Sequence, residues 1–220
     1  MVELEMRVWG FAERDVVPSQ MYVVAAKIGG QVLGAFVSAT MAGFALAYPG
    51  IRHGNPYLHS HMAAVLPEFR DLGIGRRLKL AQREDALARG IPLIEWTFDP
   101  LQAKNAYFNI CRLGAIARRY LTDVYGSTSS PLHAGLPTDR LVAEWHLDSP
   151  RVVDILTGNT PTHASSVESV RIAVDGVSPE DVARIQAKTR EQFQRLFAAG
   201  YSVIGFEREQ EGGSYILEKE

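Results

Sequence analysis

Apolar and polar residues alternate at several places in the first third of the chain, and this pattern predicts strands. Residues 2–9 alternate and predict a first strand. Residues 18–28 predict a short helix that ends at Gly29 and Gly30. Three further strands are predicted at 31–39, 41–48 and 57–66, with a tight turn near Thr40 and a loop over 49–56. These three strands are expected to form an antiparallel meander.

Helical periodicity replaces alternation in the middle of the chain. A helix is predicted over 74–89, and Gly90 and Pro92 after it are stop signals. A strand at 93–98, a second helix at about 102–112, and strands at 115–121 and 141–147 follow. The segment 123–139 is rich in Gly, Ser and Pro and is long for a mere connection, so we expect it to cover a site.

A boundary is predicted at 149–165, where polar and turn-forming residues gather. Beyond it, a strand is expected at 167–174. Ser178 and Pro179 then begin a helix with a capping pattern, and a hairpin is expected around Gly212 and Gly213. The predicted domains are therefore 1–148, a linker at 149–165, and a small α/β subdomain at 166–220 that docks on the first domain because it is marginal alone.

Composition narrows the class of protein. The 220 residues are 46% apolar and 22% charged, which is ordinary for a globular protein, and the net charge of −2 argues against bulk binding of nucleic acid. A lone cysteine, Cys111, excludes an internal disulfide, and its place in a helical pattern favours packing over nucleophilic chemistry. No run is apolar enough to span a membrane, and the N-terminus lacks signal-peptide features, so a cytoplasmic protein is expected.

The stretch from Arg70 to Gly75 carries the clearest chemical signal. It joins a predicted strand to a predicted helix that also carries Arg76, Arg77 and Lys79. A helix start attracts phosphate through its unpaired N–H groups and partial positive charge, and glycines let a ligand approach the backbone. A pyrophosphate cradle is therefore predicted, with a tight turn and a solvated basic face as the plainer alternative. Walker and dinucleotide-binding patterns do not fit.

The same residues carry a resemblance. Arg70, Gly73 and Gly75 match the Arg/Gln-x-x-Gly-x-Gly/Ala signature of the GNAT superfamily of N-acetyltransferases, whose loop holds the pyrophosphate of acetyl-CoA. Val65, Pro67 and Glu68 before the loop, and Leu113-Gly114-Ala115 after the second helix, extend the resemblance over roughly residues 1–147, most like an uncharacterised bacterial subgroup. It implies an α/β fold whose mixed, mostly antiparallel central sheet is flanked by helices.

Site residues follow from this resemblance. It implies cofactor contacts at Val65, Arg70, Leu72, Gly73, Gly75 and Arg76, with Asn105 on the second helix. Strand residues 63–65 would hold the pantetheine and the thioester carbonyl through their backbone. His59 stands at the family's base position, and His61 shares its face because side chains alternate along a strand. A structural histidine pair remains an alternative, and a metal site with His53 is a weaker one.

The resemblance implies an acyl-CoA-dependent N-acyltransferase, with acetyl-CoA as co-substrate, no metal, and direct attack by a small-molecule amine. Ile110 occupies the position where many members have a tyrosine acid, and Tyr107 and Tyr120 are the other candidates for this role. Two rival functions are a non-catalytic acyl-CoA-binding sensor or assembly module and a binder of nucleotides or phosphometabolites. No nucleic-acid or membrane partner is expected, and a homodimer remains open.

Overall fold

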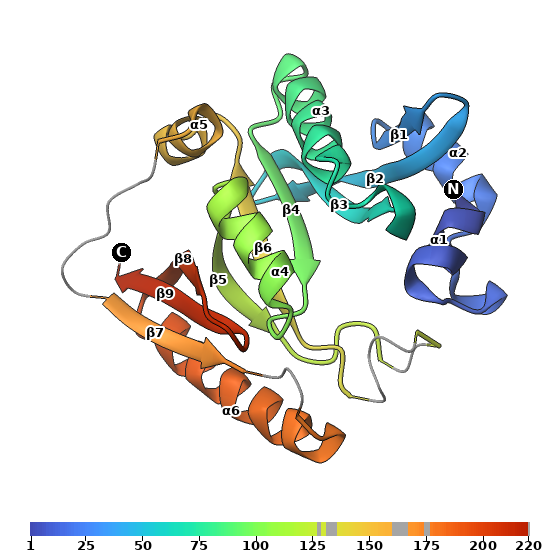
Figure 1. Ribbon diagram of the computed structural model, residues 1–220. Coiled ribbons are helices and arrows are strands. Elements are labelled where there is room, and N and C mark those ends of the chain that lie inside the picture. The colour runs from blue at the N-terminus through green and yellow to red at the C-terminus, as the bar shows by residue number, and fades with distance from the viewer. Residues whose placement is uncertain (127–128, 131–135, 160–166, 174–176, 220) are drawn as a thin grey trace. The chain divides into compact units, whose positions relative to one another are not determined.

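The computed structural model describes residues 1–126, 129–130, 136–159, 167–173 and 177–219 (Figure 1). The chain forms two compact units. The first unit holds residues 1–96 with 127–135, and the second holds 97–126 with 136–220. Each unit is described by itself below.

The first unit is built on a sheet in the order β1-β2-β3-β4. Its elements are α1 (Val2–Trp9), α2 (Ser19–Lys27), β1 (Gln31–Val37), β2 (Thr40–Arg52), β3 (Asn55–Val65), α3 (Ile74–Ala88) and the first residues of β4 (Leu93–Phe98). Antiparallel pairing of β1 with β2 and of β2 with β3 confirms the predicted meander. Strand β4 runs parallel to β3.

The loop predicted over 49–56 is much shorter in the structure. Strand β2 continues to Arg52, which pairs with Asn55 at the start of β3. The turn is therefore only His53 and Gly54, with φ of 51° and 79°. Two left-handed residues in succession match the twist of a two-residue hairpin turn, which explains why the strands run on through Pro49 and Gly50.

The strand predicted at residues 2–9 is wrong, because this segment is helix α1. The apolar residues alternate in the sequence, but Leu4 is buried and Met1 and Val8, three and four positions away, pack against the same core cluster. This spacing is that of one helical face. Glutamate, leucine and methionine are good helix formers, so intrinsic preference outweighed a short alternating pattern.

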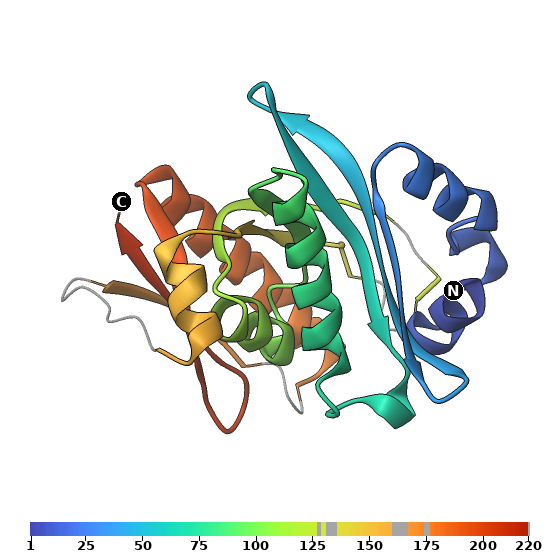
Figure 2. The same cartoon turned by 90° about the horizontal axis from the view of Figure 1, so that it is seen from above.

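Two apolar clusters lie on the two faces of the first unit's sheet. Residues of α1 and α2, such as Leu4 and Tyr22, pack with Phe44 and Leu46 of β2. On the other face, Ile74 and Leu78 of α3 pack against the small Ala42 and Ala45. Figure 2 shows α3 on one side of β2 and β3, with α1 and α2 on the other side.

The second unit contains antiparallel strands in the order β6-β5-β8-β9-β7. Its elements are α4 (Ala103–Tyr107), which continues as a π-helical turn (Phe108–Arg112), then β5 (Ile116–Leu121), β6 (Arg140–His146), α5 (Pro150–Thr157), β7 (Val167–Ile172), α6 (Pro179–Ala198), β8 (Tyr201–Arg208) and β9 (Gly213–Lys219). The predicted hairpin around Gly212 and the helix begun by Ser178 are confirmed.

The predicted linker at 149–165 contains helix α5. Ser149 caps this helix, with Pro150 at its first position, and Gly158 follows in a left-handed conformation. Residues 160–166 lie outside the described part of the chain. The domain boundaries drawn from the sequence stay a prediction.

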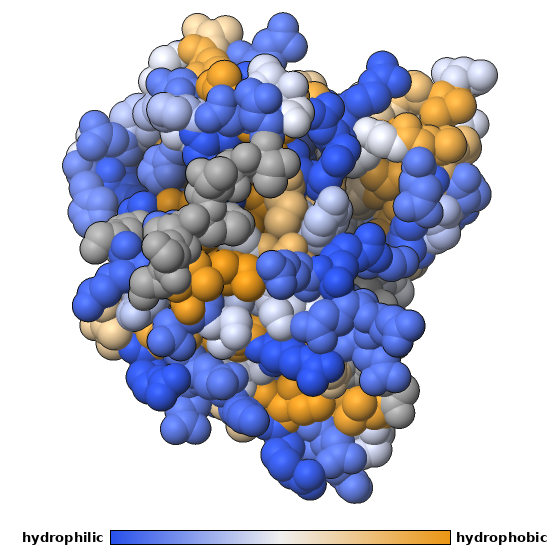
Figure 3. All heavy atoms as spheres, turned by 60° about the vertical axis from the view of Figure 1, so that its left-hand side comes forward, coloured by the Kyte–Doolittle hydropathy of each residue, from blue (hydrophilic) through white to orange (hydrophobic). Residues whose placement is uncertain are grey.

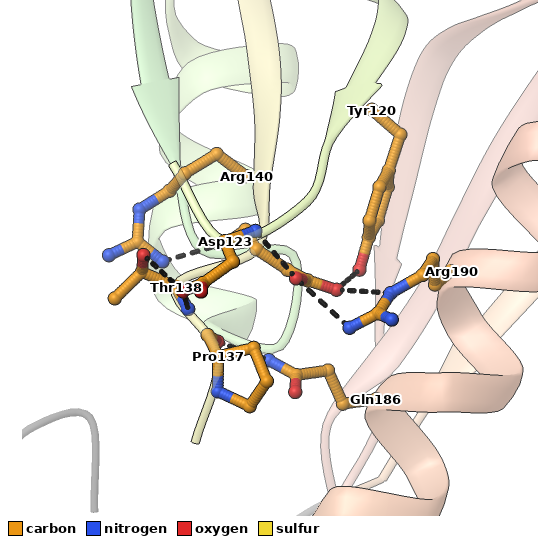
Figure 4. Close-up of polar contacts among 8 residues, drawn as sticks. Tyr120, Asp123, Pro137, Thr138, Arg140, Gln186 and Arg190 are labelled. Carbon is orange, nitrogen blue, oxygen red and sulfur yellow. Dashed lines mark hydrogen bonds and ion pairs between the residues drawn. The ribbon is translucent and has the colours of Figure 1, made fainter. Parts of the chain in front are cut away.

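A buried carboxylate ties α6 to the strands of the second unit (Figure 4). Asp139 is fully buried and accepts hydrogen bonds from Arg190 Nε at 2.8 Å and Nη2 at 3.1 Å. The Tyr120 hydroxyl donates to the same carboxylate at 2.7 Å. Gln186, one turn before Arg190, donates to the Pro137 carbonyl at 2.9 Å. Helix α6 is thus held by polar contacts as well as by its apolar face.

The surface exposes both hydrophilic and hydrophobic side chains. On the face shown in Figure 3, hydrophilic side chains surround several hydrophobic groups. None of the helices in the described part of the chain combines the length and the apolar character needed to cross a membrane.

Candidate active site

The glycine loop ends in an uncapped helix start. Asp71 and Gly73 have φ of 63° and 75°, and Gly73 is the residue before α3. Among the described residues no side chain caps this helix, so the N–H groups of Ile74 and Gly75 are presented to a ligand. A Cβ built on Gly73 meets nothing within 4 Å, and one built on Gly75 meets only Val65 Cγ2 at 3.8 Å. The open space in front of this backbone fits a pyrophosphate.

The other predicted cofactor residues surround the same helix start, apart from Asn105. Arg70 is exposed, and its Nε donates to the Val65 carbonyl at 3.3 Å, which joins the loop to the end of β3. Leu72 is exposed, and Arg76 lies half-buried in the first turn of α3. Asn105 is exposed on α4 in the second unit, so its predicted contact stays a prediction.

His59 and His61 lie together, as the sequence predicts. Their ring centroids are 6.2 Å apart, and the His61 ring lies 5.7 Å from that of Tyr48. The pairing of β3 with β2 steps from Met62 opposite Leu46 to Ser60 opposite Ala47, so His61 is an extra residue, a β-bulge. The sequence pattern did not reveal this bulge. It re-aims a side chain without separating the two rings.

Burial sets the protonation of both histidines. It lowers the pKa of His59, an effect that nearby Glu95 opposes and Lys79 strengthens. It also lowers the pKa of His61, which the neighbouring His59 lowers further. At neutral pH both imidazoles are therefore neutral, which is the state that accepts a proton.

Strands β3 and β4 separate beside His59. In the first unit the parallel pairing consists of Leu58 with Ile94 and His59 with Glu95. Glu95 is buried and forms an ion pair with Arg52 of β2. The strand end between His59 and Val65 thus forms one arm of a fork, with two histidines and a buried carboxylate at its base.

Helix α3 contributes a buried lysine to the fork, which the sequence analysis counted only among the basic residues that follow the predicted cradle. Lys79 is only 4% exposed, and its Nζ donates to Ser60 Oγ at 2.8 Å. The Nζ also lies 3.8 Å from the centroid of the Trp96 ring. Burial lowers the pKa of Lys79 to about 7. The signal that could have found it is its helical spacing, since Lys79 lies three residues before the buried Gln82 and seven before the buried Ala86.

The remaining candidates from the sequence have structural partners. Glu68 is exposed and pairs with Arg7 at 2.6 Å. Ile110 is fully buried, and Tyr120 donates its hydroxyl to Asp139. Cys111 donates its thiol to the Phe206 carbonyl at 3.3 Å, and burial raises the pKa of that thiol, which agrees with a packing role. Within the described residues no group of three or more His, Cys, Asp or Glu side chains gathers as a metal site would require.

Comparison with known proteins gives one family match. The profile described as the acetyltransferase (GNAT) family matches residues 3–109. No curated protein sequence matches the chain significantly.

Solved structures of acetyltransferases share the fold. Naa20 of Chaetomium thermophilum in complex with a bisubstrate analogue has a TM-score of 0.53 at 18% identity, over 70% of this chain and 84% of Naa20. YncA, a putative acetyltransferase from Salmonella typhimurium with its cofactor acetyl-CoA, has a TM-score of 0.52 at 16% identity, over 67% and 86%. Naa50 of Arabidopsis thaliana in complex with a bisubstrate analogue has a TM-score of 0.51 at 15% identity, over 65% and 87%. These similarities name no subgroup; the solved structures share the fold, and the family match identifies residues 3–109 as a GNAT-family acetyltransferase domain.

Proposed function

We propose that this protein transfers an acyl group, most simply acetyl, from acyl-CoA to an amine by direct attack. The observation that supports the proposal is an uncapped helix start at one end of strand β3 and a buried histidine nearer its other end. Val65 of β3 adjoins Gly75 in the first turn of α3, and His59 lies six residues earlier where β3 leaves β4. A single extended ligand can engage both.

Each step of amine acylation has a group in this arrangement. The N–H groups at the start of α3, with Arg70 and Arg76, hold the pyrophosphate. Backbone groups of 63–65 hold the pantetheine and polarise the thioester carbonyl. His59, neutral at working pH, takes the proton of the attacking amine, and His61 shapes the acceptor side. Acetyl-CoA supplies the activated acyl group.

The acceptor is proposed to be a small-molecule amine. Glu95 is buried beside His59 and, even paired with Arg52, places negative charge where an ammonium would arrive. Peptide α-amines belong in the same test, because the structures of Naa20 and Naa50 hold bisubstrate analogues and the latter carries a peptide sequence.

The test pairs binding with turnover. Calorimetry with acetyl-CoA, desulfo-CoA and ATP should show binding of the first two and little binding of ATP. Release of free thiol from acetyl-CoA should then be followed over a panel of small amines and short peptides. Turnover with any amine supports the transferase. Tight binding of acetyl-CoA without turnover across the panel would favour a non-catalytic acyl-CoA-binding sensor or assembly module instead. A preference for ATP would overturn both the transferase and this alternative.

A further inference from the structure

Lys79 lies where β3 and β4 separate. Its Nζ contacts Ser60 on β3 at 2.8 Å and lies over the Trp96 ring of β4, 3.8 Å from the centroid. Ser60 and Trp96 directly follow His59 and Glu95, the paired residues at the base of the fork. The lysine therefore reaches both arms of the fork from α3, on the face opposite to the histidines.

The polar groups around Lys79 are unusual for a helix–sheet interface. The Ser60 hydroxyl donates a hydrogen bond to Gln82 Oε1 at 3.1 Å, and Gln31 Nε2 donates to the main-chain carbonyl of Gln82 at 2.8 Å. Among the described residues, the buried Gln82 Nε2 and Gln31 Oε1 have no hydrogen-bond partner. Unpaired buried polar atoms are costly, and they are retained mainly where a site needs them.

We propose that Lys79 is the general acid of the acyl transfer, with its ammonium hydrogen-bonded to the sulfur of the leaving coenzyme A. This inference rests on the proposed function, because it places the thioester at the fork. An ammonium has three donors; Ser60 accepts one and the Trp96 ring faces the group, which leaves one for a substrate atom. The tyrosine that often serves as acid in similar enzymes is replaced by the buried Ile110.

Every bond and proton of the acyl transfer is accounted for in this arrangement. The acceptor ammonium first loses one proton to solvent, and the resulting neutral amine nitrogen then forms a bond to the acyl carbon and gives a second proton to His59. The carbon–sulfur bond breaks, its electron pair goes to sulfur, and sulfur takes a proton from Lys79. The products are an amide and coenzyme A thiol. His59 and Lys79 then return to their starting states by proton exchange with solvent.

The charges favour these roles. Burial lowers the pKa of Lys79 to about 7, and its immediate neighbours Ser60, Trp96 and Gln82 are uncharged. The charged form of Lys79 lowers the pKa of His59 on the other face of β3, although Glu95 opposes this effect. A protonated lysine thus favours a neutral histidine, which is the pair of states that the reaction needs. The ammonium of Lys79 stabilises the negative charge that develops on sulfur and then transfers its proton to it.

The decisive experiment uses coenzyme A oxidised to its sulfonate, which is permanently anionic at the sulfur, and it needs no acceptor. In the wild-type protein the affinity of the sulfonate relative to desulfo-CoA, measured by calorimetry, should fall by at least about tenfold between pH 6 and pH 9, because Lys79 loses its charge over this range. Lys79→Met should abolish this pH dependence, and Lys79→Arg should keep a preference for the sulfonate at both pH values. Lys27→Met, at an exposed lysine of α2, is the matched control and should behave as wild type. The same relative affinities in wild type and Lys79→Met would overturn the proposal.

A second measurement uses only the wild-type protein, so it does not depend on whether the Lys79 variants fold. In the wild-type protein, the NMR signal of Lys79 Cε should titrate at higher pH with the sulfonate of coenzyme A than with desulfo-CoA, by about one unit or more. Equal titration with both ligands overturns the role of Lys79 and leaves the acyltransferase proposal standing. Failure of coenzyme A to bind at all overturns the proposed function, and this inference with it.

Discussion

At the scale of single residues, the first unit places titratable groups on both faces of one strand. His59 and His61 lie on the face that Tyr48 shares, and Lys79 touches Ser60 from the other. Burial disfavours the charged form of each group, so all three have lowered pKa values. Such a cluster adds little to stability, and perturbed groups gathered in this way are typical of functional sites.

The buried lysine predicts a dependence of stability on pH. Its pKa is about 7 when folded and 10.5 in the unfolded chain, so the unfolded state binds more protons between these values. The lysine therefore destabilises the fold below pH 7, and this penalty is relieved as the pH rises toward 10.5. Between pH 7 and pH 9, wild type should gain about 2 kcal/mol of unfolding free energy relative to Lys79→Met. Denaturant titrations at both pH values measure it, and a constant difference between the two proteins would show that Lys79 is not neutralised by burial.

At the scale of elements, the strand–loop–helix from β3 to α3 is the part that the sequence predicts best. The breaks at Pro67, Gly73 and Gly90 are local, so they reveal where the elements end. The bulge at His61 and the burial of Lys79 depend on strand pairing and helix packing, and no local pattern encodes them. The sequence does not reveal helix α1, because a segment of eight residues can fit both the alternation of a strand and the periodicity of a helix. Packing around Leu4 decides in favour of the helix.

Substitution of Gly75 tests the cradle. A valine there has room, because the nearest atom to its Cβ would be Val65 Cγ2 at 3.8 Å, and Gly75 has no positive φ that would strain a side chain. Gly75→Val should therefore fold as wild type but weaken acetyl-CoA binding by more than about tenfold, about 1.4 kcal/mol, because its side chain would fill the space in front of the helix start. Calorimetry measures the affinity, and unchanged binding in a folded variant would exclude this loop as the phosphate site.

At the scale of the whole molecule, the chain forms two compact units, and the C-terminal strands continue the second. The pairing of β8 with β5 and the contact of Arg190 with Asp139 join residues of the predicted subdomain to the element before it. Long-range contacts of this kind cannot be seen in the sequence, which shows only where turn-forming residues gather.

Limited proteolysis tests the predicted linker. A protease of broad specificity is needed, because Arg151 is the only lysine or arginine in 149–165. Since α5 ends at Thr157, the first cut should fall after Gly158 and before Val167, where small and polar residues follow one another. Mass spectrometry of the first fragments locates it, and early cleavage within α3 would contradict the proposed division.

The central claim is that β3 carries the base of an acyl transfer, and the pH–rate profile of His59→Ala tests it most directly. In wild type, kcat/KM with acetyl-CoA and an accepted amine should rise through an ionisation below pH 6.5, because burial lowers the pKa of His59 and only the neutral ring accepts a proton. His59→Ala should lower turnover by roughly 10²–10⁴-fold and lose that rise, with acetyl-CoA affinity nearly unchanged. A variant that keeps both the rate and the acid limb of wild type would contradict the account.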